Sequence, residues 1–331
     1  MAVTIRDIAR ECGVAASTVS RALADDRSIG RATKARVAEA AERLGYRVNR
    51  SAQGLITGRT RNLGLIVPDL RNPFFADVAK GVQTRARERG FAVFVSDADE
   101  SPSLERTAID DLSPQVDGLL ICSPRMSDEG LQALGIADRA VLLHRRAEGF
   151  ASVVADIADG MRQAITHLHA LGHSRIAYLG GPTASWSGRE RGRGMRSAAQ
   201  DLGIELRELG PVSPDFGGGL AGADAVLASG VSAVIAFNDL VAVGLLSRFA
   251  ARGVRVPEDV SVVGFDDILV SAVATPALTT VSVPRMRAGE AAVEMHLERA
   301  GGRDEASSVA VADRTIATEL VVRASTVPAP S

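Results

Sequence analysis

The sequence predicts a small all-α unit at the N-terminus, followed by a large α/β body built on a doubly wound parallel sheet. Three observations predict this fold class. Two short amphipathic segments flank a glycine near the start of the chain. Eight apolar runs alternate with helix-length segments after residue 62, a pattern typical of parallel strands covered on both faces. The chain has 331 residues, enough for two or three folded units.

The stretch TIRDIARECGVAASTVS, from Thr4 to Ser20, has the spacing of a helix-turn-helix. Thr4 is placed to cap a first helix, Asp7 stands three residues further on to complete a capping box, and Gly13 ends the helix. The inner side of the second helix is expected to consist of Val19, Ala22 and Leu23.

The outer face of the second helix is expected to carry Ala16, Ser17 and Arg21. Small, hydroxylated and guanidinium side chains near a helix N-terminus suit the major groove of DNA, with phosphates on either side. On these residues alone, a pair of surface helices in a bundle remains the alternative interpretation.

A third helix is predicted from Arg31 to Leu44, and Gly45 ends it. The stretch that follows, NRSAQGLITG at 49–58, is too short and too polar to hold a helix by itself. It is either a plain linker or a helix induced by a partner, which would present Ala52 and Leu55 together.

Charge is divided unevenly along the chain. Residues 1–61 hold twelve Arg or Lys and six Asp or Glu, a net charge of +6, so the net charge of −2 for the whole chain leaves −8 for the remainder. A basic head on an acidic body favours a polyanion partner for the head, although ordinary surfaces also carry such unevenness.

Other classes of protein find little support in the composition. Cys12 and Cys122 lie in different predicted units, so we expect two buried thiols and no disulfide framework or metal site. The N-terminus lacks a hydrophobic signal core, and no apolar run reaches membrane-spanning length. The sequence therefore predicts a cytoplasmic protein without a membrane partner.

The predicted strands of the body are LGLIV, FAVFVS, GLLIC, AVLLH, SVVAD, RIAYLGG, AVIAF and VSVVGF. Ligands in such sheets bind beyond the carboxyl ends of the strands. Any one polar residue there is ordinary, but their recurrence predicts a polar pocket. These residues are Asp69, Ser96, Asp97, Ser123, His144, Arg145, Asp156, Asn238, Asp239, Asp266 and Asp267.

Several motifs make the chain similar to the lac repressor and galactose repressor family. The N-terminus follows a T-x-x-D-[IV]-A…G-V-S-x-x-T-V-S-R pattern from Thr4 through Arg21. The body contributes NPFF at 72–75, HLHALGHSRIAYLGGP at 167–182, SWSGRERGRG at 185–194, FND at 237–239, GFDD at 264–267 and TPALTTV at 275–281. The resemblance covers essentially the whole chain, in order.

The resemblance implies a repressor in three parts. Residues 1–48 correspond to a helix-turn-helix DNA-binding domain, 49–60 to a hinge helix that forms on the operator, and 61–331 to a body like a periplasmic sugar-binding protein. The body divides into an N-subdomain of about 61–158 plus 285–312 and a C-subdomain of about 159–284 plus 313–331. No cofactor is implied, and the expected assembly is a homodimer on a palindromic operator.

The resemblance also assigns roles on double-stranded DNA. Ala16, Ser17 and Arg21 should face base edges, with Arg21 the strongest reader. The phosphate contacts should come from Thr4, Thr18, Thr33, Tyr46 and Asn49. Leu55 matches the hinge leucine that enters the minor groove, with Ala52 beside it.

Five positions depart from the pattern of the family. Ala15 stands where a Ser usually caps the recognition helix, at a cost of about 1 kcal/mol, and Ala16 is smaller than many base-reading residues. Val48 replaces the usual Pro before the hinge. His144 and Ile157 stand where Asn or Asp is more usual, which alters those edges of the pocket.

A small-molecule effector is expected between the two subdomains. Aromatic rings facing carboxylate, amide and guanidinium groups suit a polyhydroxylated ring, so a carbohydrate is the leading candidate and a purine the alternative. On the residues alone, Phe74 could equally be a core residue and Trp186 a loop cover. The expected site consists of Asp69, Phe74, Ser123, Arg145, Trp186, Arg191, Phe216, Asn238 and Asp266.

Enzymes and transport proteins are the competing classes. His169 and His173 have i,i+4 spacing but no third ligand nearby, and Asp266 with Asp267 lacks a catalytic constellation. A solute-binding protein is favoured by the body and opposed by the basic head. The sequence leaves open whether the effector releases or strengthens DNA binding, and the TVPAPS tail favours a dimer over a tetramer.

Overall fold

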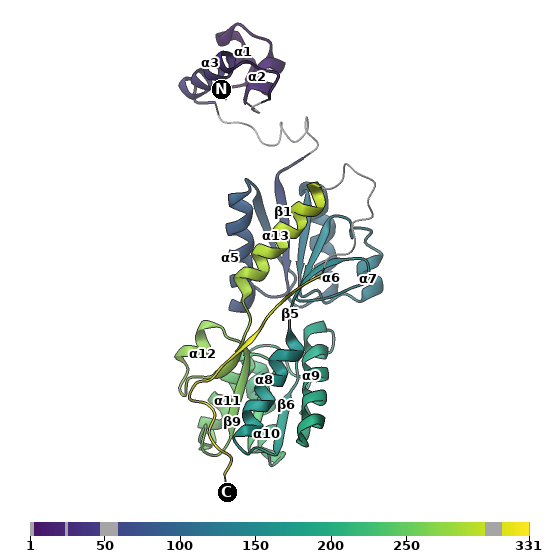
Figure 1. Cartoon of the computed structure of the whole chain (residues 1–331), viewed down its shortest axis with the longest axis vertical. Coiled ribbons are helices and arrows are strands. Elements are labelled where there is room, and N and C mark those ends of the chain that lie inside the picture. The colour runs from purple at the N-terminus through teal and green to yellow at the C-terminus, as the bar shows by residue number, and fades with distance from the viewer. Residues whose placement is uncertain (1–2, 24–25, 47–58, 302–312, 331) are drawn as a thin grey trace. The chain divides into compact units, whose positions relative to one another are not determined.

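The computed structural model describes residues 3–23, 26–46, 59–301 and 313–330. The chain splits into two compact units, Met1–Thr60 and Arg61–Ser331, which we call the head and the body and describe one at a time (Figure 1). The expected hinge residues 49–58 lie outside the described residues, so the prediction of a hinge helix stays a prediction.

Three helices make up the described part of the head: α1 (Ile5–Cys12), α2 (Ala16–Leu23) and α3 (Arg31–Arg43). The predicted capping box is formed, because the backbone N–H of Thr4 donates to Asp7 Oδ2 at 2.9 Å and the Thr4 hydroxyl to the same oxygen at 2.7 Å. Gly13 ends α1 with φ of 61°, a left-handed conformation that glycine adopts without steric cost.

One apolar cluster holds the three helices together. Its buried members come from all three: Ile8, Ala9 and Cys12 from α1, Val19 and Ala22 from α2, and Val37, Ala40 and Ala41 from α3. The inner stripe expected for α2 is therefore confirmed for Val19 and Ala22, while Leu23 is half-buried against the cluster. Cys12 is a free, buried thiol, as predicted.

The body consists of two lobes, each built around a six-stranded sheet (Figure 1). The order in the first lobe is β11-β5-β4-β3-β1-β2, with every neighbouring pair parallel. Helices α5 and α13 pack together on one face of this sheet, and α6 and α7 cover the other. The elements are β1 (Asn62–Val67), α5 (Pro73–Glu88), β2 (Ala92–Asp97), α6 (Pro102–Leu112), η1 (Ser113–Gln115), β3 (Gly118–Cys122), α7 (Asp128–Gln132), β4 (Ala140–Leu143), β5 (Ala151–Ala155), α13 (Arg285–Gly301) and β11 (Asp313–Ile316).

The second lobe repeats this plan with the order β12-β10-β9-β8-β6-β7, in which only β12 is antiparallel to its neighbour. Helices α8 and α9 pack together on one face of the sheet, and α10 and α11 cover the other face. The elements are α8 (Ile157–Ala170), β6 (Arg175–Leu179), α9 (Trp186–Leu202), β7 (Glu205–Leu209), α10 (Phe216–Ala228), β8 (Ala233–Ala236), α11 (Asp239–Ala251), β9 (Ser261–Asp266), α12 (Leu269–Val273), β10 (Thr279–Ser282) and β12 (Glu319–Val321).

All eight predicted strands are present, and the described residues form four further strands that were not predicted. The strands β7, β10, β11 and β12 escaped prediction because they lack a continuous apolar run; β7, for example, reads ELREL. Each sheet has a point at which the order of the strands reverses, so that the connections from two neighbouring strands run to opposite sides. This point lies between β1 and β3 in the first sheet and between β6 and β8 in the second. Ligands of doubly wound sheets bind at such points.

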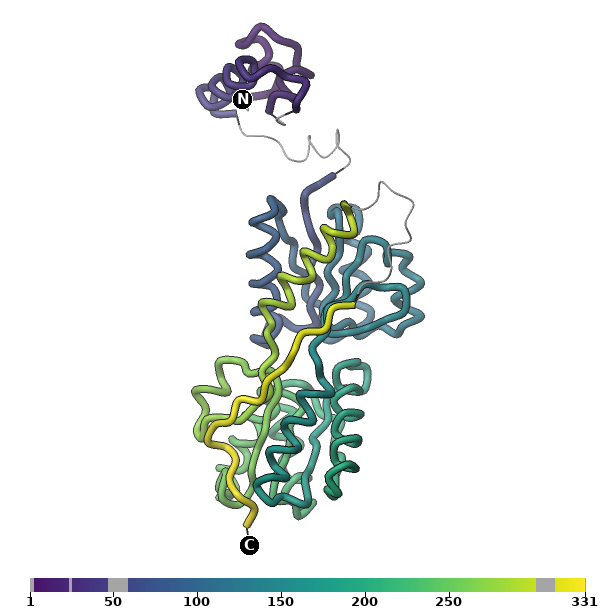
Figure 2. The backbone as a smooth tube through the Cα atoms, viewed as in Figure 1, coloured from purple at the N-terminus to yellow at the C-terminus, as the bar shows by residue number. Residues whose placement is uncertain are grey.

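The chain passes between the lobes three times, from β5 to α8, from β10 to α13 and from β11 to β12. The third passage runs along the body as the yellow C-terminal segment (Figure 2). We expected residues from 313 onward in the second lobe, but β11 pairs with β5 in the first. Arg146 explains the difference, because its guanidinium donates to Asp313 Oδ2 at 3.1 Å and to the Thr315 hydroxyl at 2.9 Å.

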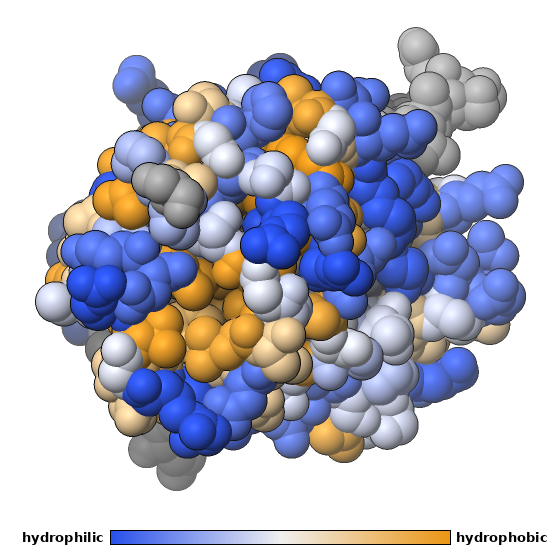
Figure 3. All heavy atoms as spheres, turned by 90° about the horizontal axis from the view of Figure 1, so that it is seen from below, coloured by the Kyte–Doolittle hydropathy of each residue, from blue (hydrophilic) through white to orange (hydrophobic). Residues whose placement is uncertain are grey.

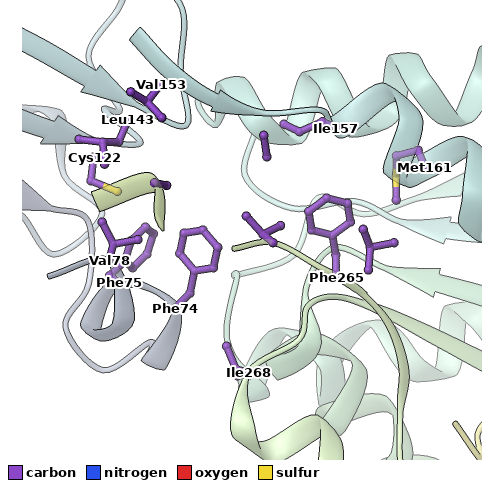
Figure 4. Packing of buried hydrophobic residues seen from close by; sticks show 14 of the residues in the cluster. Phe74, Phe75, Val78, Cys122, Leu143, Val153, Ile157, Met161, Phe265 and Ile268 are labelled. Atoms are coloured by element: carbon purple, nitrogen blue, oxygen red, sulfur yellow. The ribbon is translucent and has the colours of Figure 1, made fainter. Parts of the chain in front are cut away.

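The largest apolar cluster of the body spans both lobes. In Figure 4, Phe74 of α5 lies between first-lobe side chains such as Phe75 and second-lobe side chains such as Phe265 and Ile268. The facing surfaces of the two lobes are thus partly apolar. In the described part of the chain, no helix combines the length and the apolar character needed to cross a membrane.

Candidate functional site

The exposed face of α2 carries Ser17 and Arg21, four residues apart. Arg21 Nε donates to the Ser17 carbonyl oxygen at 3.3 Å, so the guanidinium lies along this face. Ala16 was expected to point outward but is half-buried against the head cluster, because a methyl group beside an apolar cluster gains from burial. Of the three residues expected to face base edges, Ser17 and Arg21 are exposed and Ala16 is half-buried.

The residues expected to contact phosphate differ in their exposure to solvent. Thr4 is exposed at the start of α1, while Thr18, Thr33 and Tyr46 are half-buried. Asn49, Ala52 and Leu55 lie outside the described residues.

The start of α2 lacks a side-chain cap at Ala15, as its sequence implies. The Ala15 carbonyl oxygen accepts the backbone N–H groups of Thr18 at 2.9 Å and Val19 at 3.1 Å, but a methyl side chain cannot accept a hydrogen bond. Helix α2 therefore forgoes a contact typically worth about 1 kcal/mol at a helix start.

A narrow cleft lies between the two lobes of the body, beyond the carboxyl ends of their strands. Its free volume is about 40 Å³, whereas small-molecule pockets usually offer about 300–1,000 Å³. The lobes are therefore closed against each other. The lining residues are Asn72, Phe74, Phe75, Glu100, Ser123, Arg125, His144, Ala155, Ile157, Ser185, Ser187, Arg191, Pro214, Phe237, Asn238, Phe265, Asp266 and Val283.

Arg191 of α9 is the central polar residue on the second-lobe side. One guanidinium nitrogen, Nη1, donates to the Phe237 carbonyl oxygen at 2.6 Å, and Nη2 donates to Asp266 Oδ1 at 3.2 Å. The rings of Phe237 and Phe265 lie 4.6 and 3.9 Å from its Cζ atom. A buried cation is thus held by a carboxylate, a carbonyl oxygen and two aromatic faces.

The carboxylate that pairs with Arg191 is unusually basic. Burial raises the pKa of Asp266 to about 6, although the charges of Arg191 and Arg285 oppose the shift. Asp239 is also fully buried, where it accepts from the Thr280 hydroxyl at 2.5 Å and from the backbone N–H of Ile268 at 2.8 Å. Burial, with the charge of Asp266, raises the pKa of Asp239 well above its usual range.

His144 faces the cleft from the first lobe, directly after β4. Its ring lies edge-on to Phe74 at 5.0 Å, and within the described structure its buried Nε2 has no hydrogen-bond partner. Burial, reinforced by the charges of Arg191 and Arg285, lowers the pKa of His144 to about 4. The imidazole is therefore neutral at pH 7 and has one ring nitrogen available for a ligand.

Two side chains join the lobes at the cleft. The Ser187 hydroxyl of α9 donates to the His144 carbonyl oxygen at 2.8 Å. Arg285, at the start of α13, donates from Nε to Asp77 Oδ2 of α5 at 3.0 Å and from Nη1 to the Asp266 carbonyl oxygen. The contacts of Ser187 with His144 and of Arg285 with Asp266 join the two lobes across the cleft.

A second ion pair lies on the first-lobe side of the cleft. Arg125 donates from Nε and Nη2 to the two carboxylate oxygens of Glu100, at 2.6 and 2.9 Å. Buried Glu105 anchors this loop by accepting the backbone N–H of Arg125 at 2.6 Å, and burial raises the pKa of Glu105. The two guanidinium groups that line the cleft are each neutralised by a carboxylate that also lines it.

Backbone strain is concentrated at these strand ends. The φ angles of Ser123, His144 and Asp266 are 46°, 54° and 116°, a region that residues with a Cβ seldom adopt. Such strain commonly accompanies functional sites. Here it turns side chains at the ends of β3, β4 and β9 toward the cleft.

Five of the nine expected effector residues line the cleft: Phe74, Ser123, Arg191, Asn238 and Asp266. Asn238 also caps α11, because its Oδ1 accepts the Val241 N–H at 2.9 Å and its Nδ2 donates to the Pro214 carbonyl oxygen at 2.8 Å. Its amide therefore has limited capacity left for a ligand.

The other four expected residues do not line the described cleft, and the structure gives the reason for each. Arg145 is 1% exposed and donates to the carbonyl oxygens of Pro124 and Met126 at 2.8 and 2.5 Å. Asp69 accepts from Arg71 at 3.0 Å. Trp186 is half-buried against the core, and Phe216 is 42% exposed at the start of α10.

Sequence reasoning missed Glu100, Arg125 and Ser187 as cleft residues. Arg125 and Glu100 belong to loops without periodicity, so no signal distinguished them. Ser187 stands within the SWSGRERGRG motif, which was the available clue. His144 and Ile157, singled out as unusual pocket edges, both line the cleft.

The residues weighed for metal or acid–base chemistry have structural contacts instead. His173 bonds through Nδ1 to the Ser232 hydroxyl at 2.8 Å and through Nε2 to the Val327 carbonyl oxygen at 3.0 Å. Asp267 accepts from Arg323 at 2.6 Å. Both therefore tie the C-terminal segment to the second lobe, and Cys122 is a buried free thiol with its pKa raised by burial to about 12.

Comparison with known proteins agrees with the two-unit architecture. The family model of bacterial regulatory proteins of the lacI family matches residues 4–49, and that of a periplasmic binding protein-like domain matches 165–326. The HTH-type transcriptional regulator DegA of Bacillus subtilis (strain 168) is 31% identical over 338 aligned positions, which cover 99% of each chain.

Two solved structures extend this similarity to the whole fold. A lac repressor dimer bound to operator and the anti-inducer ONPF has a TM-score of 0.85 and 28% identity, covering 99% of this chain and 100% of that one. The transcriptional regulator CelR in complex with cellobiose has a TM-score of 0.71 and 30% identity, covering 98% and 99% of the two chains.

Proposed function

Because the chain belongs to the lacI family of bacterial regulatory proteins, we propose that it represses transcription under the control of a small molecule bound in the cleft. Family membership makes it a DNA-binding transcriptional regulator and not an enzyme. The proposal concerns the direction of regulation, the effector and the way in which the cleft acts on the head.

The closed cleft is the observation that carries the proposal. Its free volume of about 40 Å³ is too small for a ligand of sugar size, so a ligand must part the lobes to enter. Parting them breaks the contact between Ser187 and His144 and the contact of Arg285 with the Asp266 carbonyl oxygen. A ligand with different affinity for open and closed lobes shifts the equilibrium between them, and operator affinity changes with it.

A neutral polyhydroxylated molecule is the effector that the cleft suits best. The rings of Phe74, Phe237 and Phe265 offer apolar faces, and Asp266 and His144 offer acceptors for hydroxyl groups. The paired state of Arg125 and Arg191 disfavours an anionic group in the cleft. The solved complex of CelR with cellobiose supports a carbohydrate.

We assign DNA binding to residues 1–48, the hinge to 49–60 and effector binding to the body. Within the hinge, Ala52 and Leu55 are proposed to enter the minor groove.

A homodimer on a palindromic site is proposed because one head reads too few base pairs. Leu269 and Val273, one turn apart on α12, are 77% and 69% exposed, and Figure 3 shows apolar side chains gathered among hydrophilic ones on the lower face.

A mobility-shift titration tests the proposal directly. The full chain is titrated against DNA from its own upstream region, alone and with a panel of neutral sugars and purines, at several salt concentrations. We expect a specific complex with two chains and an operator affinity that changes with one sugar. A ligand that binds the body without changing operator affinity would contradict control by the cleft, and the absence of any specific complex would contradict the repressor.

Replacing Arg21 with Ala should lower operator affinity by about 1–3 kcal/mol and relax discrimination at one base pair, because a bidentate contact to guanine is lost. Affinity for random DNA should change much less. Arg10→Ala removes the same charge from α1 and serves as the control, with equal losses expected on both DNAs. Equal losses for Arg21→Ala would show that Arg21 contacts only phosphate.

Replacing Ser187 with Ala should speed the entry of a sugar about fivefold, because it removes a hydrogen bond of about 1 kcal/mol that joins the lobes. Stopped-flow fluorescence of Trp186 measures the association rate. Ser229→Ala is the matched control, since its hydroxyl donates to the Val226 carbonyl oxygen within one lobe. An association rate unchanged from the wild type would mean that this contact does not restrain opening.

A further inference from the structure

A second hollow lies in the second lobe, apart from the cleft. Its volume is about 410 Å³, within the range of about 300–1,000 Å³ usual for small-molecule sites. Residues 180–183 after β6, residues 208–211 at the end of β7, and one face of α9 form it. The lining residues of this hollow and those of the cleft do not overlap.

The hollow is basic. Three guanidinium groups line it, those of Arg189, Arg193 and Arg196, against one lining carboxylate, that of Glu208. Arg196 pairs with Glu208 at 2.6 Å, and Arg193 pairs with Glu190 at 2.8 Å. This leaves a net positive charge on the lining residues.

Arg189 is the guanidinium best placed to receive an anion. Its Nη1 donates to the carbonyl oxygens of Thr183 and Ala184 at 3.0 and 3.3 Å, which fixes its position on the rim. Among the described residues it meets these carbonyl oxygens and no carboxylate. An exposed arginine that is positioned but not neutralised is suited to an oxyanion.

Tyr178 of β6 supplies an independent sign of a ligand. The residue is 4% exposed and lines the hollow, and its buried hydroxyl has no hydrogen-bond partner within the described structure. A buried hydroxyl without an acceptor is costly. Gly192 of α9 lies close to this ring, because a Cβ there would be 3.8 Å from Tyr178 Cε1 and 3.4 Å from Nη1 of Arg196.

We propose that this hollow binds the phosphate or carboxylate group of a small metabolite, with Arg189 as its cation and the Tyr178 hydroxyl as a donor. The site is separate from the effector cleft and of opposite character, because both guanidinium groups that line the cleft are paired with carboxylates. The hollow, at about 410 Å³, has room for the rest of the metabolite.

Fluorescence of Trp186 can report binding, since it is the one Trp of the chain and begins α9. The full chain, without DNA, is titrated with inorganic phosphate, glucose 6-phosphate and citrate at constant ionic strength, and with glucose as the neutral control. We expect a saturable response to at least one anion, and the same response when glucose is already present at saturation, because a neutral sugar can occupy only the cleft. The phosphate and citrate arms distinguish the two kinds of oxyanion.

Three variants decide where the anion binds. Arg189→Ala should weaken binding at least tenfold, and Tyr178→Phe, which keeps the ring packing, should weaken it severalfold. Arg207→Ala removes an equal charge from a residue of β7 that pairs with Glu205 outside the hollow, and it should bind as the wild type does. Equal affinity in Arg189→Ala and Arg207→Ala would mean an adventitious ion only, and no response to any anion would overturn the proposal.

Discussion

Replacing Arg191 with Met is expected to lower the free energy of unfolding of the body by about 3–5 kcal/mol at pH 9, where Asp266, with its pKa of about 6, is fully ionised. Methionine has a similar length and fills the space between the rings of Phe237 and Phe265, but it leaves the carboxylate of Asp266 buried without its cation. The loss of an ion-pair partner, rather than a cavity, is the reason for the large effect. Chemical denaturation of the full chain, followed through the body, measures it.

Two further variants isolate the cause. The double variant Arg191→Met with Asp266→Asn should recover most of the loss, since replacing both members of a buried pair is often nearly neutral. Arg193→Met, on the exposed side of the same helix, should stay within about 0.5 kcal/mol of the wild type. If the double variant were as unstable as the single one, packing rather than an unpaired charge would explain the loss.

The second large effect is a dependence of stability on pH. Asp266 should make the body more stable at acid pH, whereas carboxylates in ion pairs usually make a protein less stable there. The pKa of Asp266 is about 6 in the folded body and about 3.9 in an unfolded chain. The folded state thus binds the proton more tightly. The stabilisation from protonated Asp266 is complete below about pH 4 and is lost as the pH rises through about 6, a change of roughly 3 kcal/mol.

The comparison of the wild type with Asp266→Asn isolates this contribution. The variant should gain roughly 3 kcal/mol relative to the wild type between pH 4 and pH 7, while groups that do not interact with Asp266 titrate alike in both proteins. Asp239 acts in the same direction, because the charge of Asp266 contributes to its raised pKa and the variant removes that repulsion. A difference in unfolding free energy that is flat with pH would contradict the buried, basic carboxylate.

The helices and strands were largely predictable because they are encoded locally. Thr4, Asp7 and Gly13 define α1 through caps that involve only neighbouring residues. The interior strands follow from runs of Val, Leu and Ile, which parallel strands need because both of their faces are covered. The edge strands β7 and β11 carry charged residues, and their pairing depends on distant parts of the chain.

The sequence by itself determined the family, the two-unit organisation and the band of polar residues at the strand ends, since each depends on motifs or short-range periodicity. Only the tertiary structure decided which of those residues meet. His144 and Arg145 are neighbours in sequence, yet a φ of 54° at His144 places His144 in the cleft, while Arg145 is buried against the loop of Pro124 and Met126. Likewise, Arg125 joins the cleft through Glu100, twenty-five residues away. The direction of a side chain at a strand end is set by backbone strain and by partners from other loops, and local periodicity carries neither.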